Sequence, residues 1–252
     1  MSVAMDPKEF KARPDTLEGR TILITGASGG LGRALALDCA RAGASVILSG
    51  RNLAKLESAY DQIAALGAAE PALAPLDLAA ATAADYDALA ATVEREYGKL
   101  DGLVHAAALL GDRSPLANYD VPTWCRVLHV NLTAPFILTQ VLLPCLRKSA
   151  HASVIFASSG VVKSPRPFWG AYAVSKVGLE AVRGMLCEEL AAISKVRFNS
   201  VNPGPMRTAM RLAAYPGEDP NTLPAPESVT GAFLYLLSAA GAAIDGRYFD
   251  AQ

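Results

Sequence analysis

The feature that most restricts the fold of this chain is a glycine-rich turn between a short apolar run and a segment of helical length. The turn reads TGASGGLG from Thr25 to Gly32, after the apolar run 21–25 and before an amphipathic segment that ends near Ala42. Glycines let the backbone approach a diphosphate, and the N–H groups and dipole of a helix start attract its charge. A plain tight turn is the alternative, but this placement favours a dinucleotide site. The turn residues expected to contact a cofactor are Gly26, Ser28, Gly30, Leu31 and Gly32.

Short apolar runs and helix-length amphipathic segments alternate along the chain, which is the pattern of successive βαβ units. We expect strands at 21–25, 45–49, 72–76, 100–105, 153–157 and 197–201, and helices at 30–42, 52–66, 83–97, 123–146 and 170–193. The pattern predicts one α/β domain: a Rossmann-type, doubly wound parallel sheet with helices on both faces. With 252 residues, 52% of them hydrophobic, the chain can bury a large core in a single domain.

Two segments depart from this alternation. Residues 1–16 contain Pro7 and Pro14 and no apolar periodicity, so we expect a loosely held arm ahead of a domain at 17–252. Residues 205–226 are rich in proline, glycine, methionine and charge, which favours a mobile lid over a pocket. An ordinary surface connection is the alternative for this second segment.

Composition restricts the classes of partner and compartment. The 23 basic and 24 acidic residues nearly balance, so neither nucleic acid nor a membrane surface is an expected partner. The first 16 residues lack the apolar core of a signal peptide, and we expect a cytoplasmic protein. The cysteines are widely spaced and the histidines form no pair four residues apart, so no metal site is expected.

Tyr172 and Lys176 stand four residues apart, which on a helix places phenol and ammonium one turn apart on one face. A nearby cation favours the phenolate and brings a tyrosine toward a useful range for proton transfer. Ser159 follows the apolar run 153–157, and the carboxyl ends of parallel strands are where ligands bind. We therefore expect these three side chains to share one crevice, although a lone Tyr-x-x-x-Lys pair is common on helix surfaces.

The end of the expected second strand bears on the choice of cofactor. A carboxylate there would bind a free ribose 2′-hydroxyl and repel a 2′-phosphate. This chain has Gly50 at that position, followed by Arg51 and Asn52. A guanidinium suits a phosphate, so we expect NADPH, with NADH less favoured. The alternative is a solvated Arg51 followed by Asn52 as the cap of the next helix.

These motifs together make the chain resemble the short-chain dehydrogenase/reductase family from Arg20 to the C-terminus. The motifs that carry the resemblance are Thr25 to Gly32, Asp77-Leu78, Asn131, Ser159, Tyr172 with Lys176, and Pro203-Gly204 with Thr208. Local strings resemble more narrowly the YciK-type oxidoreductases of that family. These strings are Gly-Leu-Val-His105, Leu109-Leu110-Gly111-Asp112, Trp169-Gly170-Ala171-Tyr172 and Arg207-Thr208-Ala209-Met210-Arg211.

The resemblance implies a role for each matching residue. Tyr172 would be the general acid or base, and Lys176 would lower its pKa and hold the nicotinamide ribose. Ser159 would donate a hydrogen bond to the carbonyl oxygen, and Asn131 would hold a water in a proton relay. Asp77 and Leu78 would bracket adenine. The nicotinamide end would be lined by Pro203, Gly204, Met206 and Thr208, and the cofactor site would also include Ala106, Ala107 and Ala108.

One departure from the family pattern concerns the segment after the fourth strand. The family usually has Asn-Asn-Ala-Gly there, whereas this chain has His105, Ala106, Ala107 and Ala108. Losing the asparagine side chain at 106 removes hydrogen bonds, and Ala108 adds a methyl group near the cofactor. We expect a cost in stability or in cofactor affinity.

The function expected from these residues is reduction of a small-molecule carbonyl, or oxidation of an alcohol, with NADPH. A 3-oxoacyl carrier-protein reductase is an alternative, with Arg113, Arg207 and Arg211 as a candidate basic patch. A non-catalytic NADPH-binding sensor on the same fold is another. The apolar residues Leu109, Leu110, Trp169, Met210 and Tyr215 are candidates to face the substrate. Excess apolar residues on the helices around Asn131 and Tyr172 favour a homodimer or homotetramer.

Overall fold

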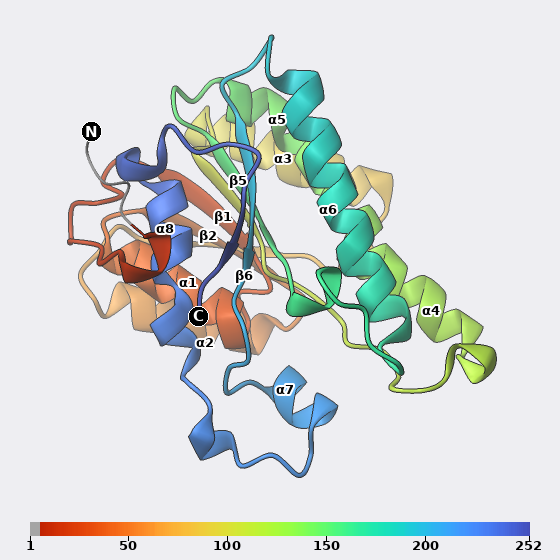
Figure 1. The fold of residues 1–252 in the computed structure, drawn as a ribbon. Helices are drawn as coiled ribbons and strands as arrows, with labels where there is room; N and C mark the ends of the chain where they lie inside the picture. The colour runs from red at the N-terminus through yellow and green to blue at the C-terminus, as the bar shows by residue number, and fades with distance from the viewer. Residues whose placement is uncertain (1–5) are drawn as a thin grey trace.

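The computed structural model describes residues 6–252. Within that range one sheet of seven parallel strands forms the centre of the molecule (Figure 1). The strands are β1 (Thr21–Thr25), β2 (Ser45–Gly50), β3 (Ala72–Pro75), β4 (Gly102–His105), β5 (Ser153–Ala157), β6 (Arg197–Asn202) and β7 (Tyr248–Asp250). Their order is β3-β2-β1-β4-β5-β6-β7, so the chain reverses its direction across the sheet between β1 and β4. Sheets of this type open a ligand crevice at the carboxyl ends of strands at such a switch point.

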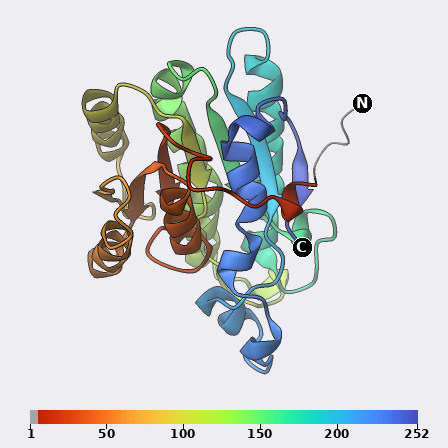
Figure 2. The same cartoon turned by 90° about the vertical axis from the view of Figure 1, so that its left-hand side faces the viewer.

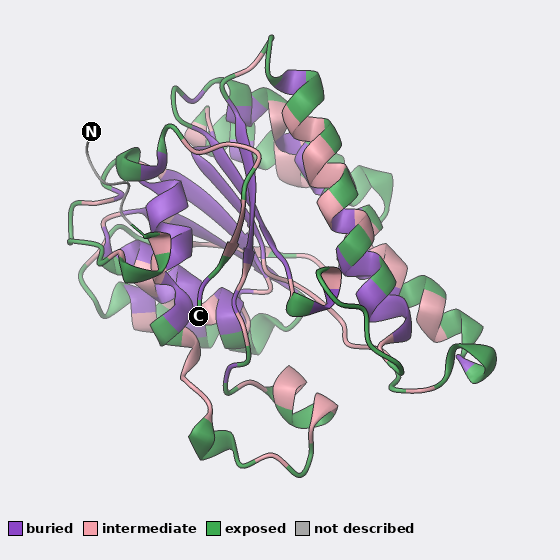
Figure 3. Ribbon diagram, viewed as in Figure 1, coloured by how far each residue is buried: buried purple, intermediate pink, exposed green. Residues whose placement is uncertain are grey.

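Helices cover both faces of the sheet (Figures 1 and 2). They are α1 (Gly30–Arg41), α2 (Leu53–Ala64), α3 (Ala83–Tyr97), α4 (Val121–Leu128), α5 (Ala134–Arg147), α6 (Gly170–Leu190), α7 (Ala209–Ala214) and α8 (Gly231–Leu237). One core cluster joins one face of the sheet to α1, α2 and α8, and a second joins the other face to α3, α5 and α6. The central strands are buried along their length, as Figure 3 shows. The expected doubly wound α/β fold is therefore confirmed.

The expected elements agree with the structure to within a few residues. Strands β1 and β5 match residue for residue, whereas α6 ends at Leu190 rather than 193 and β4 begins at Gly102 rather than 100. Helices α7 and α8 and strand β7 were not expected. Each is short, and α8 has the sequence GAFLYLL, which is apolar on all sides and shows no helical periodicity.

The expected arm, residues 1–16, lies partly outside the described residues. Residues 6–16 are mostly exposed, but the ring of Phe10 packs edge-on against Tyr235 of α8 with ring centroids 5.5 Å apart. Leu17 is fully buried in the first core cluster. The side chains of Phe10 and Leu17 thus connect this end of the chain to the domain.

Helices α4 and α5 form one continuous helix joined by a π-helical turn, His129–Thr133. The backbone N–H of Ala134 bonds to the carbonyl of His129, five residues back. The whole segment Val121–Arg147 has the length and the mean hydropathy, 1.4, of a membrane-spanning helix. Its apolar side chains Leu138, Leu142 and Leu146 are nevertheless fully buried in the core, so its hydropathy reflects packing on the sheet.

Candidate active site

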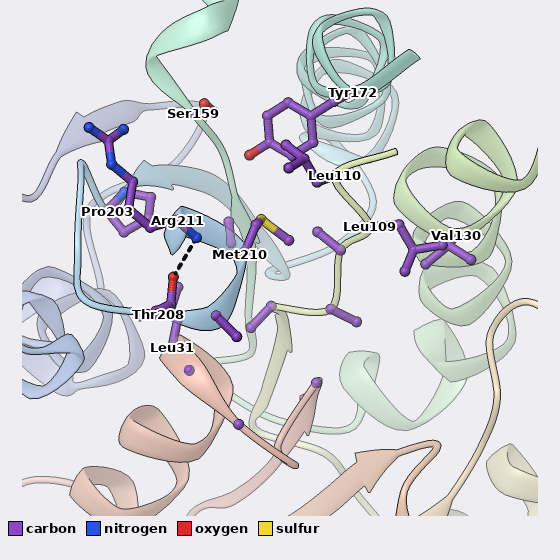
Figure 4. Close-up of a pocket in the computed structure, with 18 of the residues that line it drawn as sticks. Leu31, Leu109, Leu110, Val130, Ser159, Tyr172, Pro203, Thr208, Met210 and Arg211 are labelled. Carbon is purple, nitrogen blue, oxygen red and sulfur yellow. Dashed lines mark hydrogen bonds between the residues drawn. The ribbon is translucent and has the colours of Figure 1, made fainter. Parts of the chain in front are cut away.

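A cavity of about 590 Å³ lies along the carboxyl ends of the strands (Figure 4). Its walls come from the turn after β1, from the ends of β2, β4, β5 and β6, from the start of α6 and from α7. These segments are far apart in the sequence and meet because parallel strands end at the same edge. The cavity is therefore the crevice that the topology predicts.

The glycine-rich turn fits a close approach of backbone to ligand. Gly26 has φ +70°, and a Cβ on it would lie 2.9 Å from the backbone of Ala107. A Cβ on Gly32 would collide with the carbonyl group of Gly26. Both positions therefore require glycine, although only Gly26 lines the cavity, whereas Gly32 lets α1 pack against the turn.

Thr25 holds the segment after β4 in place. Its hydroxyl oxygen accepts hydrogen bonds from the backbone N–H groups of Ala106 and Ala107, at 3.1 Å and 3.2 Å. The same hydroxyl donates to the carbonyl of Val104 at 3.3 Å. The side chain of His105 points to the other face, where Nε2 lies 2.9 Å from Oγ1 of Thr139 on α5. Thr25 and His105 thus anchor the segment in which the family's asparagine is absent.

The far end of the cavity carries the residues expected to read the adenosine ribose. Arg51 and Asn52 both line it, next to Ser28 of the turn. Asn52 also caps α2, because its Oδ1 accepts a hydrogen bond from the backbone N–H of Lys55 at 3.0 Å. Lys55 lines the same end and was not expected. Its position four residues after Arg51 was the available signal.

Tyr172, Lys176 and Ser159 meet at the opposite end. Figure 4 shows the phenol of Tyr172 and the hydroxyl of Ser159 in one part of the cavity. The Ser159 hydroxyl acts on the phenol by lowering its pKa. Lys176 is 3% exposed, and its ammonium donates a hydrogen bond to the carbonyl of Ala157 at 2.6 Å. The structure therefore brings together the three residues that the sequence paired.

The pKa directions in this group differ from one expectation. Burial raises the pKa of Tyr172, and the Ser159 hydroxyl only partly opposes this. Burial also lowers the pKa of Lys176 to about 8. The net direction of the Tyr172 shift is therefore opposite to the lowering that we expected from Lys176. The ammonium bonds to Ala157 and lies 5.8 Å from the centroid of the phenol ring, and desolvation of the buried phenol is the largest cause of its raised pKa.

Asn131 lies in the π-helical turn and is 1% exposed. Its Oδ1 accepts from the backbone N–H of Leu109 at 2.7 Å, and its Nδ2 donates to the carbonyl of Leu109 at 2.8 Å and to Oγ of Ser175 at 3.1 Å. The hydroxyl of Ser175 donates to the carbonyl of Tyr172 at 2.7 Å. The Asn131 side chain does not line the cavity. It links the segment after β4 to α6, whereas we expected it to hold a water.

An aromatic and arginine cluster closes the cavity beyond Tyr172. The ring of Trp169 lies 5.6 Å from that of Tyr172 and 6.1 Å from that of Tyr215. The guanidinium of Arg113 lies 4.5 Å from the centroid of Trp169 and donates to the carbonyl of Ala214 at 2.8 Å. These contacts join the segment after β4, the start of α6 and the end of α7.

A second arginine acts within the segment expected to be a lid. Arg211 lies 3.9 Å from the ring centroid of Tyr215 and forms two hydrogen bonds with Glu218, at 2.5 Å and 2.6 Å. Thr208 caps the N-terminus of α7: its hydroxyl accepts a hydrogen bond from the backbone N–H of Arg211 at 3.2 Å (Figure 4). Two of the three arginines of the candidate basic patch, Arg113 and Arg211, are thus engaged in contacts around this segment.

Most of the expected site residues line this single cavity. They are Gly26, Ser28, Gly30, Leu31, Arg51, Asn52, Asp77, Leu78, Ala106, Ala107, Ala108, Ser159, Tyr172, Lys176, Pro203, Gly204, Met206 and Thr208. The candidate substrate-facing residues Leu109, Leu110, Trp169, Met210 and Tyr215 line it too. Val161 and Arg166 also line it and were not expected, because no motif marks them.

Comparison with known proteins is consistent with this geometry. A family model for short chain dehydrogenases matches residues 20–219. The oxidoreductase YciK of Escherichia coli is 41% identical over 96% of this chain and 96% of its own length. A 3-oxoacyl-[acyl-carrier-protein] reductase of Thermotoga maritima is 32% identical over 77% of each chain.

Solved structures agree over nearly the whole chain. A short chain dehydrogenase from Pseudomonas syringae superposes with a TM-score of 0.95 at 45% identity, covering 97% of this chain and 99% of its own. One from Escherichia coli complexed with NADPH gives a TM-score of 0.92 at 42% identity, covering 95% and 99%. The architecture of this chain thus has close counterparts among short chain dehydrogenases.

Proposed function

Because the chain belongs to the short-chain dehydrogenase/reductase family of oxidoreductases, we propose that it interconverts a carbonyl and an alcohol with NADPH, using Tyr172 as proton donor or acceptor. The observation that carries the proposal is the meeting of Ser159, Tyr172 and Lys176 in the cavity that the glycine-rich turn also lines. A phosphate-binding turn and a proton-transfer group in one crevice are what nicotinamide chemistry requires.

The cavity fits such a cofactor along its length. The turn has no room for a Cβ at Gly26, and the first turn of α1 presents backbone N–H groups for a diphosphate. Arg51 and Lys55 supply two cations for a 2′-phosphate at the adenosine end, which favours NADPH over NADH. Relatives crystallised with NADP or NADPH support this choice. Bound NADPH would supply the hydride.

The chain's own residues would manage the proton and the charge. The raised pKa of Tyr172 keeps the phenol protonated near neutral pH, so it can donate to the oxygen of a carbonyl. The hydroxyl of Ser159, which lines the same cavity, would donate to the same oxygen as its negative charge develops. The Lys176 ammonium lies one helical turn from the phenol and would support the phenolate after transfer.

The substrate end favours an apolar carbonyl compound. Val161, Leu110, Met210 and Trp169 pack around Tyr172, so the carbon skeleton beside the reacting group would meet apolar and aromatic surfaces. A carrier-protein substrate would need a basic surface at the mouth. Arg113 and Arg211 are committed to Ala214 and Glu218 instead, so we favour a free small molecule over the carrier-protein alternative.

We also propose a homo-oligomer and a cytoplasmic location. Helices α5 and α6 carry exposed apolar side chains, with Phe136 at 42%, Val177 at 43% and Met185 at 54% exposure. Such a surface suits a two-fold pairing of these helices. Light scattering of the purified protein tests the oligomer, and a monomer at micromolar concentration would contradict it.

The proposed chemistry is tested with Tyr172→Phe. This change keeps the ring and its packing but removes the proton, so we expect NADPH to bind with unchanged affinity and turnover to fall by at least about 100-fold. The assay is NADPH oxidation with a panel of apolar ketones, aldehydes and acyl thioesters. Unchanged turnover in the variant would refute the role of Tyr172. Tight NADPH binding by the wild type without any turnover across the panel would favour the sensor alternative.

A further inference from the structure

The face of α6 that carries Tyr172 and Lys176 continues to a partly buried acid, whose side chain is 19% exposed. Glu180 follows Lys176 at the same interval of four residues, so the three side chains lie along one face of the helix. The Glu180 carboxylate accepts from Oγ of Ser158 at 2.6 Å, from Oγ of Ser200 at 2.8 Å and from Nε of Arg183 at 3.0 Å. It therefore ties α6 to the carboxyl ends of β5 and β6.

Ser158, which donates a hydrogen bond to Glu180, lies in the chain between Ala157 and Ser159, and each of these neighbours acts on a residue of the proton-transfer group. Ser158 precedes Ser159, whose hydroxyl lowers the pKa of the Tyr172 phenol, and follows Ala157, whose carbonyl accepts the Lys176 ammonium at 2.6 Å. The backbone N–H of Ser158 donates to the carbonyl of Val201 on β6 at 2.8 Å. Any shift of Ser158 relative to α6 would thus change both contacts together.

Glu180 is also the acid that acts on the Lys176 ammonium. Burial lowers the pKa of Lys176 to about 8, and the negative charge of Glu180 opposes that shift. The other titratable groups that act near Lys176 are Tyr172 on the same helix and His105 on β4, which burial keeps neutral. Glu180 itself faces Arg183 on its own helix, the hydroxyls from β5 and β6, and Tyr248 on β7.

We propose that Glu180 is a positioning residue for the reaction: its carboxylate fixes Ala157 and Ser159 against α6, and its charge keeps the Lys176 ammonium protonated. The proposal rests on the proposed function, because it assigns Glu180 a task only if Tyr172 and Lys176 perform theirs. None of the motifs in the sequence marks this residue, and it touches neither the carbonyl nor the cofactor site directly, since it does not line the cavity.

Two variants of Glu180 test its charge and its hydrogen bonds separately. In Glu180→Gln the amide still bonds to the serine hydroxyls but carries no charge. Lys176 then loses its proton at a lower pH, and the alkaline limb of kcat moves down by about one pH unit. In Glu180→Ala the hydrogen bonds to Ser158 and Ser200, which clamp α6 to the sheet, are lost as well. We expect kcat to fall roughly 10- to 100-fold at every pH, with KM changed less. Near pH 6 the Gln variant should match the wild type and the Ala variant should not.

A second measurement needs no substrate. The affinity for NADPH, followed by the fluorescence of the bound nicotinamide, should weaken as the pH rises through the pKa of Lys176. The pH at which NADPH affinity weakens should also move down by about one pH unit in Glu180→Gln. The matched control is Glu189→Gln, at an exposed position on the same helix, which should leave both profiles in place. Thermal melting of each variant shows whether it is folded at the temperature of the assay.

The outcomes distinguish this proposal from the proposed function. If NADPH affinity weakens at the same pH in Glu180→Gln as in the wild type, the charge of Glu180 does not keep Lys176 protonated and that part of the proposal is overturned. If the kcat of folded Glu180→Ala equals that of the wild type, the clamp role is overturned. A wild type that turns over no carbonyl refutes the reductase function instead, and the pH dependence of NADPH affinity then still decides whether Glu180 controls Lys176.

Discussion

Nε2 of His105 lies 2.9 Å from Oγ1 of Thr139, between β4 and α5. The Thr139 hydroxyl already donates its proton to the carbonyl of Pro135 at 2.8 Å, so the imidazole carries its proton on Nε2. The ring is stacked on Phe156 with centroids 5.0 Å apart. Burial, with a smaller contribution from the charge of Lys176, lowers the pKa of His105 to about 3.

This histidine should make the protein sensitive to acid. An unfolded chain takes up a proton on His105 near pH 6.5, whereas the folded chain resists protonation down to about pH 3. The free energy of unfolding should therefore fall as the pH decreases from about 6.5, by up to about 3 kcal/mol at pH 4. We expect His105→Asn to flatten the dependence of Tm on pH in this window. His151→Asn, at an exposed position, is the control, and equal slopes for His105→Asn and the wild type would contradict the prediction.

Thr25 should support both stability and cofactor binding. Thr25→Val keeps the shape of the side chain but removes the acceptor for the N–H groups of Ala106 and Ala107. We expect a loss of about 2 kcal/mol in the free energy of unfolding and weaker NADPH binding, since this segment lines the cavity. Thr25→Ser keeps the hydroxyl and should lose less than half as much. Denaturant unfolding and NADPH titration measure both effects, and equal losses in the two variants would rule out the hydrogen bonds as the cause.

The cations at the adenosine end should decide the choice between the two nicotinamide cofactors. We expect Arg51→Ala to weaken NADPH binding about 10- to 100-fold, because a charge-assisted contact to the 2′-phosphate is lost, and to leave NADH binding nearly unchanged. Lys55→Ala should show the same selectivity with a smaller effect. Dissociation constants for both cofactors provide the measurement. An equal loss of NADH and NADPH affinity would mean that Arg51 supports the fold of this end rather than reading a phosphate.

Arg113 should restrain the segment around α7. Its guanidinium stacks on Trp169 and bonds to the carbonyl of Ala214, so Arg113→Leu removes the link between that segment and the start of α6. We expect faster amide hydrogen exchange over residues 209–218 in this variant and little change in the central strands. Arg207→Leu, at an exposed position just before α7, is the matched control. Unchanged exchange in Arg113→Leu would show that α7 is held by other contacts.

Much of the fold and of the cavity could be predicted from the sequence because the responsible signals are local. Alternating apolar runs indicated the parallel strands, and the turn at Gly26 has steric requirements that only glycine meets. Ser159, Tyr172 and Lys176 could be placed in one crevice because the ends of parallel strands and the starts of the following helices share one edge.

The remainder depends on contacts that no local pattern encodes. The hydroxyls of Thr25 and Ser175, the carboxylate of Glu180 and the imidazole of His105 act through partners distant in the chain. The pKa direction of Tyr172 also depends on burial, which the spacing of Tyr172 and Lys176 does not show. Helix α8 and strand β7 were missed because they are too short to show a period.

The π-helical turn at His129–Thr133 sets the rotational phase between the two halves of a long helix. One additional residue is accommodated there, so winding the same residues as a regular α-helix would turn α4 by about 100° relative to α5. The helix would survive such rewinding, but α4 would turn away from α6, which it now contacts. The winding of this stretch is therefore constrained by angular alignment rather than by helix stability.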